Sequence, residues 1–193
     1  MPLRVQILMY DGVEEQDAIG PRDVLGHAVQ AGGQVETTLV RPSAPGEVTC
    51  FFGTKVTVPT AWEPTDTDVL IVPGGGDQLI HDPDVLRDLV RAQEAGVIVA
   101  GVCTGVMVLS AAGLTKGRPC TTHHLAKADL AAQGGRVIDA RVVDDGNLVT
   151  AGGVTSGIDL ALWIITRECG ASVALGVESI MEYEQRGGVW RSS

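Results

Sequence analysis

The chain has 193 residues, a formal net charge of −10 and an isoelectric point near 4.7. Such an acidic surface argues against nucleic-acid binding, which depends on Lys and Arg side chains that neutralise phosphates. A hydrophobic fraction of 45% and a mean hydropathy of +0.19 argue against disorder and suit a single domain spanning residues 1–193.

The periodicity of apolar residues predicts alternating strands and helices. The strands expected in chain order are 4–10, 34–40, 49–52, 55–59, 68–73, 97–102, a short strand through Cys120, 136–143 and 148–151. The helices expected are one beginning near Gly20-Pro21 and ending at Gly32, then 84–94, one following Cys103, 125–133, and two within 152–182. The 49–52 and 55–59 strands read as a peripheral hairpin.

This alternation specifies an α/β fold with a mainly parallel, doubly wound sheet and helices on both faces. In such sheets, sites form at the carboxyl ends of the strands. Asp17, the glycine run 74–76 and Cys103 each follow a predicted strand, so three distant segments are expected to converge.

Cys103 lies in Gly101-Val102-Cys103-Thr104-Gly105, a G-x-C-x-G pattern between an apolar strand and a helix. This is the sulfur counterpart of the nucleophile elbow, and the N-terminus of the following helix favours a thiolate. We therefore expect a reactive thiol with a low pKa rather than one of the many inert buried cysteines. The charge-free stretch 95–114 has transmembrane length, but four glycines interrupt it and no aromatic belt flanks it.

A cysteine nucleophile needs an acid or base and donors for developing negative charge. Among four carboxylates near the first strand end, Asp17 precedes apolar Ala18-Ile19 and is the one expected to point inward, with a pKa raised toward neutrality. Gly75, Gly76 and Thr104 are the candidate oxyanion or substrate-binding residues, although glycine runs are often plain turns. His123 is the alternative base, and Asp159 fits an S-x-x-D helix cap.

The chain shows no signal peptide, so a cytoplasmic location is expected. Its other cysteines, Cys50, Cys120 and Cys169, are too widely spaced for a zinc site or a disulfide framework, and its histidines lack metal-binding spacing. We predict no metal, no cofactor, no membrane partner and a small-molecule substrate.

Together, the A-G-V-C-T-G segment, the P-G-G-G loop and the block T-A-G-G-V-T-S-G-I-D-L-A-L resemble the ThiJ/PfpI superfamily of class I glutamine-amidotransferase-like proteins. The Asp17-Ala18-Ile19-Gly20-Pro21 segment with Cys103-Thr104 is similar to its isocyanide hydratase branch. The resemblance implies a flavodoxin-like homodimer with Cys103 as nucleophile, Asp17 hydrogen-bonded to its sulfur, Thr104 and Gly75 around the site, and His123 adjacent. His124 and Leu25 depart from the residues common in relatives, which leaves the pocket shape open.

Three functions are compatible with these residues. The first is hydration of an isocyanide to an N-substituted formamide through a Cys103 thioimidate. The second is a glyoxalase- or deglycase-like reaction on α-oxoaldehydes, and the third is a non-catalytic redox sensor based on Cys103 oxidation. Fold alone does not separate them.

Overall fold

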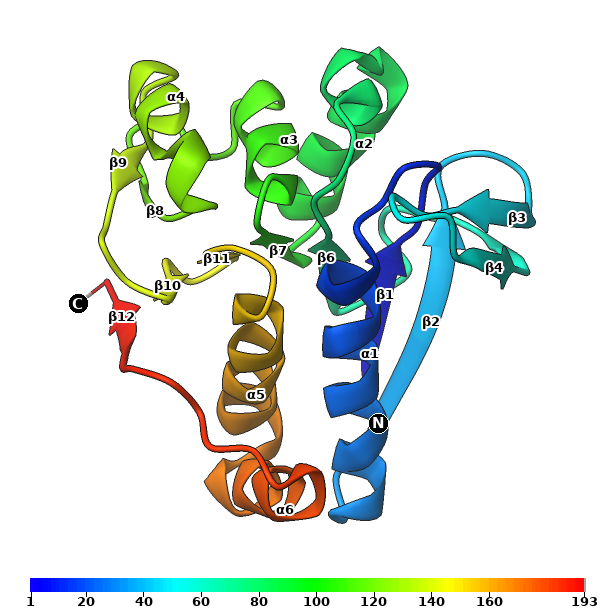
Figure 1. Ribbon diagram of the computed structural model, residues 1–193, viewed down its shortest axis with the longest axis vertical. Helices are drawn as coiled ribbons and strands as arrows, with labels where there is room; N and C mark the ends of the chain where they lie inside the picture. Colours follow the sequence, from blue (N-terminus) through cyan, green and yellow to red (C-terminus); the bar gives the residue numbers. More distant parts are fainter. Residues whose placement is uncertain (193) are drawn as a thin grey trace.

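The computed structural model describes residues 1–192 and contains one large sheet between two helical layers (Figure 1). The spatial order of the large sheet is β12-β10-β11-β7-β6-β1-β2-β5. Its strands are β1 (Leu3–Leu8), β2 (Val35–Arg41), β5 (Thr60–Ala61), β6 (Val69–Val72), β7 (Ile98–Val102), β10 (Val142–Asp144), β11 (Leu148–Ala151) and β12 (Val189–Arg191). All neighbours pair in parallel except β10 and β11, so the predicted mainly parallel sheet is confirmed.

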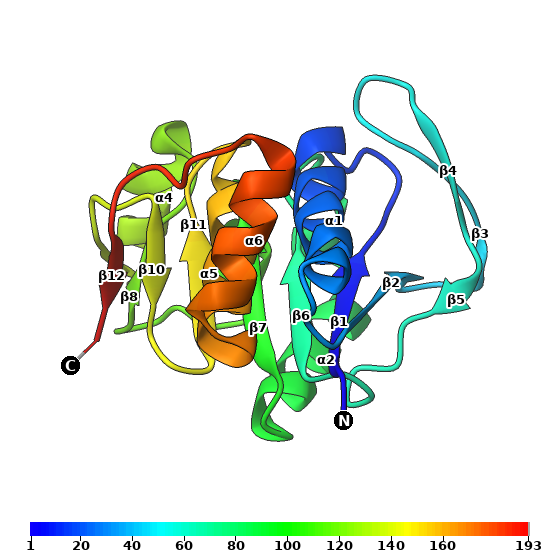
Figure 2. The same cartoon turned by 90° about the horizontal axis from the view of Figure 1, so that it is seen from below.

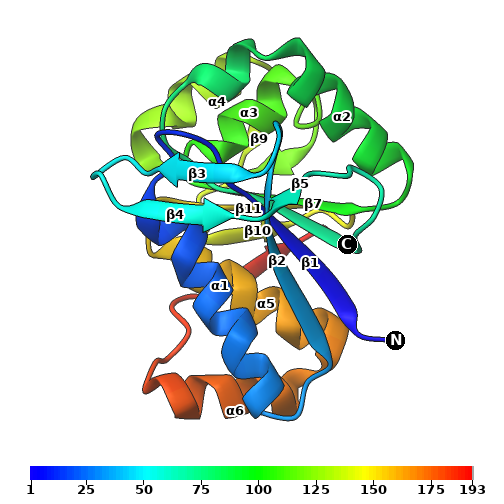
Figure 3. The same ribbon diagram turned by 90° about the vertical axis from the view of Figure 1, so that its right-hand side faces the viewer.

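Helices cover both faces of this sheet, as Figure 3 shows in edge view. The α-helices are α1 (Glu15–Gln30), α2 (Pro83–Glu94), α3 (Gly105–Ala111), α4 (Lys127–Ala132), α5 (Ser156–Cys169) and α6 (Ala171–Met181). One layer contains α1, α5 and α6, and the other contains α2, α3 and α4 (Figures 2 and 3). Short 3-10 helices η1 (Gln78–His81) and η2 (His124–Ala126) precede α2 and α4. Burial on both faces explains why β6 is apolar at all four positions.

The predicted hairpin is present but shifted toward the N-terminus. It consists of β3 (Gly46–Thr49) and β4 (Lys55–Val58), which form a separate two-stranded sheet. Residues 50–52, expected to be strand, belong to the turn instead, because the Glu15 carboxylate accepts hydrogen bonds from the backbone N–H groups of Phe52 and Thr54. The prediction that this hairpin is peripheral is confirmed.

The predicted 136–143 strand is wrong, because two short strands belonging to different sheets occupy that segment. In it, β9 (Arg136–Val137) pairs with β8 (Pro119–Cys120), and β10 joins the large sheet. The edge strands β5 and β12 were not predicted; β5 has only two residues, and β12 follows a polar segment without alternation.

Helix α1 begins five residues before the predicted start at Gly20. The Glu14 side chain accepts a hydrogen bond from the backbone N–H of Asp17 at 2.8 Å and so caps the helix. Pro21 lies inside α1, where it removes one hydrogen bond toward the preceding turn. Asp17 therefore sits in the first turn of a helix and not in the loop before it.

The charge-free stretch 95–114 is divided between β7 and α3. Within residues 1–192, none of the helices combines the length and the apolar character that crossing a bilayer would require.

Candidate active site

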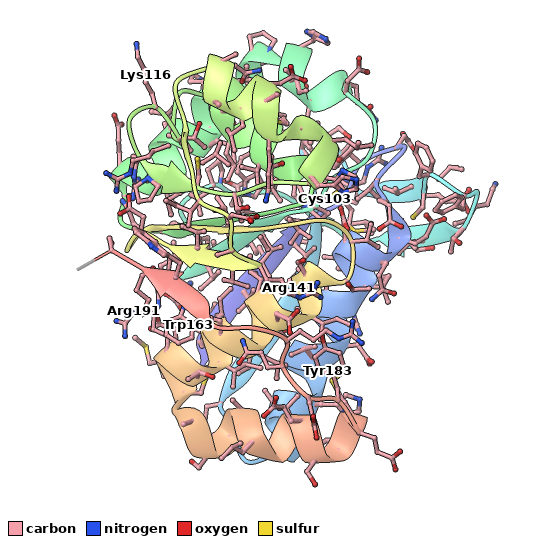
Figure 4. The ribbon with its side chains drawn as sticks, turned by 60° about the vertical axis from the view of Figure 1, so that its left-hand side comes forward. Cys103, Lys116, Arg141, Trp163, Tyr183 and Arg191 are labelled. Atoms are coloured by element: carbon pink, nitrogen blue, oxygen red, sulfur yellow. The ribbon has the colours of Figure 1, made fainter. Side chains whose placement is uncertain are left out.

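Cys103 stands at the carboxyl end of β7, immediately before α3, with a φ of 56° (Figure 4). This left-handed conformation is uncommon for a residue with a side chain and marks a sharp turn. A Cβ on Gly105 would lie 2.1 Å from the Val72 carbonyl oxygen, so only glycine allows α3 to approach β6 this closely. The strand-turn-helix geometry predicted around Cys103 is therefore present.

Backbone donors surround the sulfur of Cys103. The N–H groups of Thr104 and Val154 hydrogen-bond to it, and both lower the pKa of the thiol. Val154 itself has a φ of 37°, a left-handed conformation that is uncommon for a β-branched residue. The Thr122 hydroxyl donates to the Cys103 carbonyl oxygen at 2.7 Å and fixes the turn from a third segment. Sequence reasoning missed Val154, although it lies in the T-A-G-G-V-T-S-G block.

Asp17 is fully buried beside Cys103. Its Oδ2 accepts a hydrogen bond from the Gly74 N–H at 3.0 Å, and its carboxyl group lies near enough to Cys103 for a side-chain hydrogen bond to alter both pKa values. Oδ1 is also buried and, within residues 1–192, lacks a partner of ordinary hydrogen-bond geometry. The inward orientation expected for Asp17 is confirmed.

The pKa of Asp17 is raised to about 7, first by burial and then by the negative charge of Glu14. The expected direction is confirmed, but its electrostatic source is Glu14 and not the thiolate. At neutral pH this carboxyl group is therefore divided between its acid and base forms, which suits a group that both accepts and donates a proton.

The pKa of Cys103 is raised to about 11, first by burial and then by the charge on Asp17. The expectation of an unusually acidic thiol is wrong for this site. Desolvation and the neighbouring carboxylate outweigh the backbone donors of Thr104 and Val154. Between the two pKa values the Asp17–Cys103 pair holds one proton.

The glycine run 74–76 closes one side of the site. The Gly75 N–H donates to Thr104 Oγ1 at 3.1 Å, and the Gly76 N–H donates to the Gly12 carbonyl oxygen at 3.0 Å. The two N–H groups predicted as oxyanion donors thus already donate to acceptors within the protein. The Gly75 N–H orients the Thr104 hydroxyl. An oxyanion role for Gly75 or Gly76 stays a prediction.

Gly74 was not among the predicted site residues, yet it is the glycine most constrained by the site. A Cβ on Gly74 would lie 2.6 Å from Thr104 Oγ1 and 2.7 Å from Asp17 Oδ2. Tyr10 supports the same loop, because its buried hydroxyl donates to the Pro73 carbonyl oxygen at 3.0 Å. Gly74 thus brings the backbone against both functional side chains.

His123 lies near the site but is hydrogen-bonded elsewhere. Its Nδ1 accepts from the Leu125 N–H at 3.3 Å, and its ring is 4.3 Å from that of His124 between centroids. Burial and His124 both lower the pKa of His123, which favours the neutral ring at neutral pH. The role of His123 stays a prediction.

The capping role expected for Asp159 is wrong. Helix α5 has no side-chain cap, and the buried Asp159 carboxylate instead pairs with Arg141 and accepts from the Tyr183 hydroxyl at 3.0 Å. Figure 4 labels Arg141 and Tyr183. Asp159 thus ties the chain after α6 to α5.

All four cysteines are free; Cys50, Cys103 and Cys120 are buried, and Cys169 is half-buried. Among the described residues, no three His, Cys, Asp or Glu side chains group in a way that could hold a metal ion.

Comparisons with known proteins agree with this fold. The DJ-1/PfpI family model matches residues 3–167. An isonitrile hydratase of Pseudomonas putida is 37% identical over 188 residues, covering 95% of this chain and 79% of the relative. A deglycase of Thermococcus kodakarensis is 31% identical, covering 77% of this chain and 89% of the relative. The crystal structure of a ThiJ/PfpI family protein from Pseudomonas syringae has a TM-score of 0.86 and 30% identity, covering 97% of this chain and 77% of that one.

Proposed function

The chain belongs to the DJ-1/PfpI family, and from this premise we propose that it is an isocyanide hydratase that adds water to R–N≡C to give an N-substituted formamide. The observation that carries the proposal is the buried Asp17–Cys103 pair, which holds one transferable proton at pH values between the two pKa values of about 7 and about 11. The similarity to the isonitrile hydratase of Pseudomonas putida supports the same reaction class.

In the first step, the Asp17 carboxylate accepts the thiol proton as the Cys103 sulfur attacks the terminal carbon of the isocyanide. The Thr104 and Val154 N–H groups stabilise negative charge on sulfur while the proton is on Asp17. The terminal carbon becomes basic once the C–S bond forms, and Asp17 returns the proton to it. The product of this step is a thioimidate, R–N=CH–S–Cys103.

In the second step, Asp17 is again ionised and takes a proton from a water molecule that attacks the thioimidate carbon. The second water proton, on the hydroxyl group now bonded to carbon, is transferred to the nitrogen as the C=O bond forms. The C–S bond breaks at the same time, and the departing sulfur takes the proton held by Asp17, which restores the thiol and the carboxylate. The overall change is R–N≡C plus water to R–NH–CHO, with no change of oxidation state in the protein. One carboxyl group with a pKa near 7 performs both transfers, since it alternates between acid and base.

Two other functions remain as alternatives. A deglycase- or glyoxalase-like reaction is favoured by the similarity to the deglycase of Thermococcus kodakarensis. A redox sensor would use oxidation of Cys103, but oxidation requires thiolate character and exposure. Cys103 is only 7% exposed and its pKa is raised, so the sensor is disfavoured.

The deciding experiment offers the purified protein p-nitrophenyl isocyanide and methylglyoxal in parallel. We expect formamide from the isocyanide, no turnover of methylglyoxal and loss of formamide production in Cys103→Ala. Turnover of methylglyoxal alone would replace the hydratase with the second function, and turnover of neither would point to a non-catalytic thiol.

A further inference from the structure

Two separate cavities adjoin residues that contact the Cys103 sulfur. The two backbone donors to that sulfur identify them, because Thr104 lines a cavity of about 470 Å³ and Val154 lines another of about 450 Å³. Each volume is within the range of small-molecule sites. A carbon atom bound to Cys103 therefore has two directions in which its substituent can extend.

The cavity beside Thr104, here called the α3–α4 cavity, combines apolar side chains with two carboxylates. Ile80, Met107, Ala126 and Ala132 supply the apolar wall, while Asp77 and Asp129 supply the carboxylates. Its lining contains no Lys, Arg or His side chain. Burying an apolar group against the apolar side chains is favourable. The negative charges of Asp77 and Asp129 repel a carboxylate.

The cavity beside Val154 has the opposite character. Its lining includes His123, His124, Lys127 and Arg141, against the single carboxylate of Asp139. Lys127 donates to Asp139 at 2.7 Å, and the Arg141 guanidinium is bound to Asp159 and Thr155. The charged groups Lys127, Asp139 and Arg141 of this cavity are thus already paired within the protein, and they offer an apolar substituent little surface to cover.

Building on the proposed function, we propose that the α3–α4 cavity holds the nitrogen substituent of the isocyanide and selects uncharged, apolar substituents over anionic ones. The thioimidate carbon then lies at the sulfur, between the donors and Asp17, while the substituent extends past Thr104 toward Met107. Ala126 and Ala132 are the specificity-determining positions, because a larger side chain at either one shortens the cavity without touching Cys103 or Asp17.

The test compares two substitutions of equal size, one in each cavity. Ala126→Phe fills the α3–α4 cavity, and Ala140→Phe fills the cavity beside Val154, where Ala140 is part of the lining. We expect Ala126→Phe to lower the kcat/KM ratio of cyclohexyl isocyanide to methyl isocyanide by about tenfold or more, since pocket contacts of a few methylenes discriminate on that scale. Ala140→Phe should leave the ratio unchanged. The reverse pattern, or an equal change in both variants, would overturn the proposal.

A second measurement does not depend on hydratase activity. The rates at which iodoacetamide and its N-cyclohexyl derivative alkylate Cys103 are compared in the same variants, with the modified residue identified by mass spectrometry. The cyclohexyl reagent should be slowed selectively in Ala126→Phe. If the protein turns over no isocyanide yet shows this selectivity, the proposed function fails and the assignment of the cavity stands; without the selectivity, the assignment fails.

The charge preference is tested with iodoacetate, which differs from iodoacetamide by its negative charge. The ratio of the iodoacetate rate to the iodoacetamide rate should rise several-fold in an Asp77→Asn/Asp129→Asn double variant, and the gain should shrink at high salt because both carboxylates are exposed. An unchanged ratio at low salt would remove the anionic exclusion from the proposal.

Discussion

The carboxylate of Glu14 accepts a hydrogen bond from the backbone N–H of Asp17 at 2.8 Å, so the residue that caps α1 also places a second negative charge beside the buried acid. Capping a helix with a carboxylate ordinarily stabilises the helix and nothing more. Here it contributes to the raised pKa of Asp17. One side chain thus links the start of the helix to the proton chemistry of the site.

Glu14→Gln is expected to shift the pH dependence of isocyanide hydration. The reaction needs ionised Asp17 to accept the thiol proton, so kcat/KM should rise with pH through the Asp17 pKa of about 7. Glutamine retains an oxygen for the cap and removes the charge that raises this pKa. The rising limb of the profile of kcat/KM against pH should therefore move to lower pH. Glu15→Gln is the matched control, because Glu15 is not among the groups that raise the pKa of Asp17, and equal shifts in both variants would contradict the assignment.

Thiolate formation at Cys103 is expected near pH 11 in the wild-type protein and at lower pH in Asp17→Asn. The physical reason is that the Asp17 charge is the second contribution, after burial, to the raised pKa of the thiol. The measurement is thiolate ultraviolet absorbance against pH, with Cys103→Ala subtracted to remove the other cysteines. A wild-type midpoint at or below the free-thiol value of about 8.5 would show that burial and the Asp17 charge do not outweigh the backbone donors to the sulfur.

Much of this fold followed from local pattern, whereas the site depended on contacts across the sheet. The alternation of apolar segments predicted the mainly parallel sheet, and the G-x-C-x-G pattern predicted the turn at Cys103. Gly75 and Thr104 were expected at one site, but the hydrogen bond from the Gly75 N–H to Thr104 Oγ1 was not predictable. The two residues are 29 positions apart in the chain and meet only through the packing of β6 against β7.

The pKa of the Cys103 thiol is raised where the sequence predicted that it would be lowered, and the reason is similar. The prediction of a low thiol pKa rested on the N-terminus of the following helix, which is a local feature. Burial and the Asp17 charge, which raise this pKa, arise from three segments packed together. Likewise, nothing local distinguished Gly74 from its two glycine neighbours. Its special position follows from the short distances to Asp17 and Thr104, which belong to different elements.

Gly74→Ala is expected to lower activity strongly while leaving the fold intact. The added methyl group would lie 2.6 Å from Thr104 Oγ1, 2.7 Å from Asp17 Oδ2 and 2.8 Å from the Thr104 backbone nitrogen, so both side chains and the start of α3 must shift locally. Gly26→Ala is the control, because a Cβ there meets nothing within 4 Å and the change should be neutral or stabilise α1 by roughly 0.5–1 kcal/mol. Formamide production and thermal unfolding are measured for both variants. Unchanged turnover in Gly74→Ala would show that the positions of Asp17 and Thr104 are not critical.

Tyr10→Phe is expected to reduce kcat with little effect on folding. It removes the buried hydrogen bond to the Pro73 carbonyl oxygen and so loosens the loop whose Gly74 N–H binds Asp17. Losing one such bond destabilises by about 1 kcal/mol, which is small for a chain of this size. If Tyr10 positions Asp17, the variant should have a lower kcat, and the rising limb of its kcat/KM against pH, which follows the pKa of Asp17, should be displaced. A loss of stability without that displacement would mean that Tyr10 has only a structural role.

Asp17→Asn is expected to abolish hydration and yet stabilise the protein, and the two effects have one cause. The pKa of Asp17 is about 7 in the folded protein and near 3.8 in an unfolded chain, so ionisation favours the unfolded chain. As pH rises from about 4 to 7 the wild-type protein therefore loses stability, and above 7 the loss is complete at a few kcal/mol. Asparagine keeps an acceptor for the Gly74 N–H without an ionisable group. The variant should thus unfold at a higher temperature than wild type at pH 8, and the difference should shrink at pH 5.

The same substitution removes the group that moves the proton between sulfur, carbon and water, so formamide production should fall by about 10² to 10⁴. Cys103 should still react with iodoacetamide, because the thiol remains and its pKa falls when the Asp17 charge is gone. Asp17→Glu should retain part of the activity, since the added methylene displaces the carboxyl group from the sulfur. Near wild-type hydration in Asp17→Asn would remove Asp17 from the mechanism and transfer its role to His123. An unchanged unfolding temperature at pH 8 would mean that folding does not raise the pKa of the buried carboxyl group.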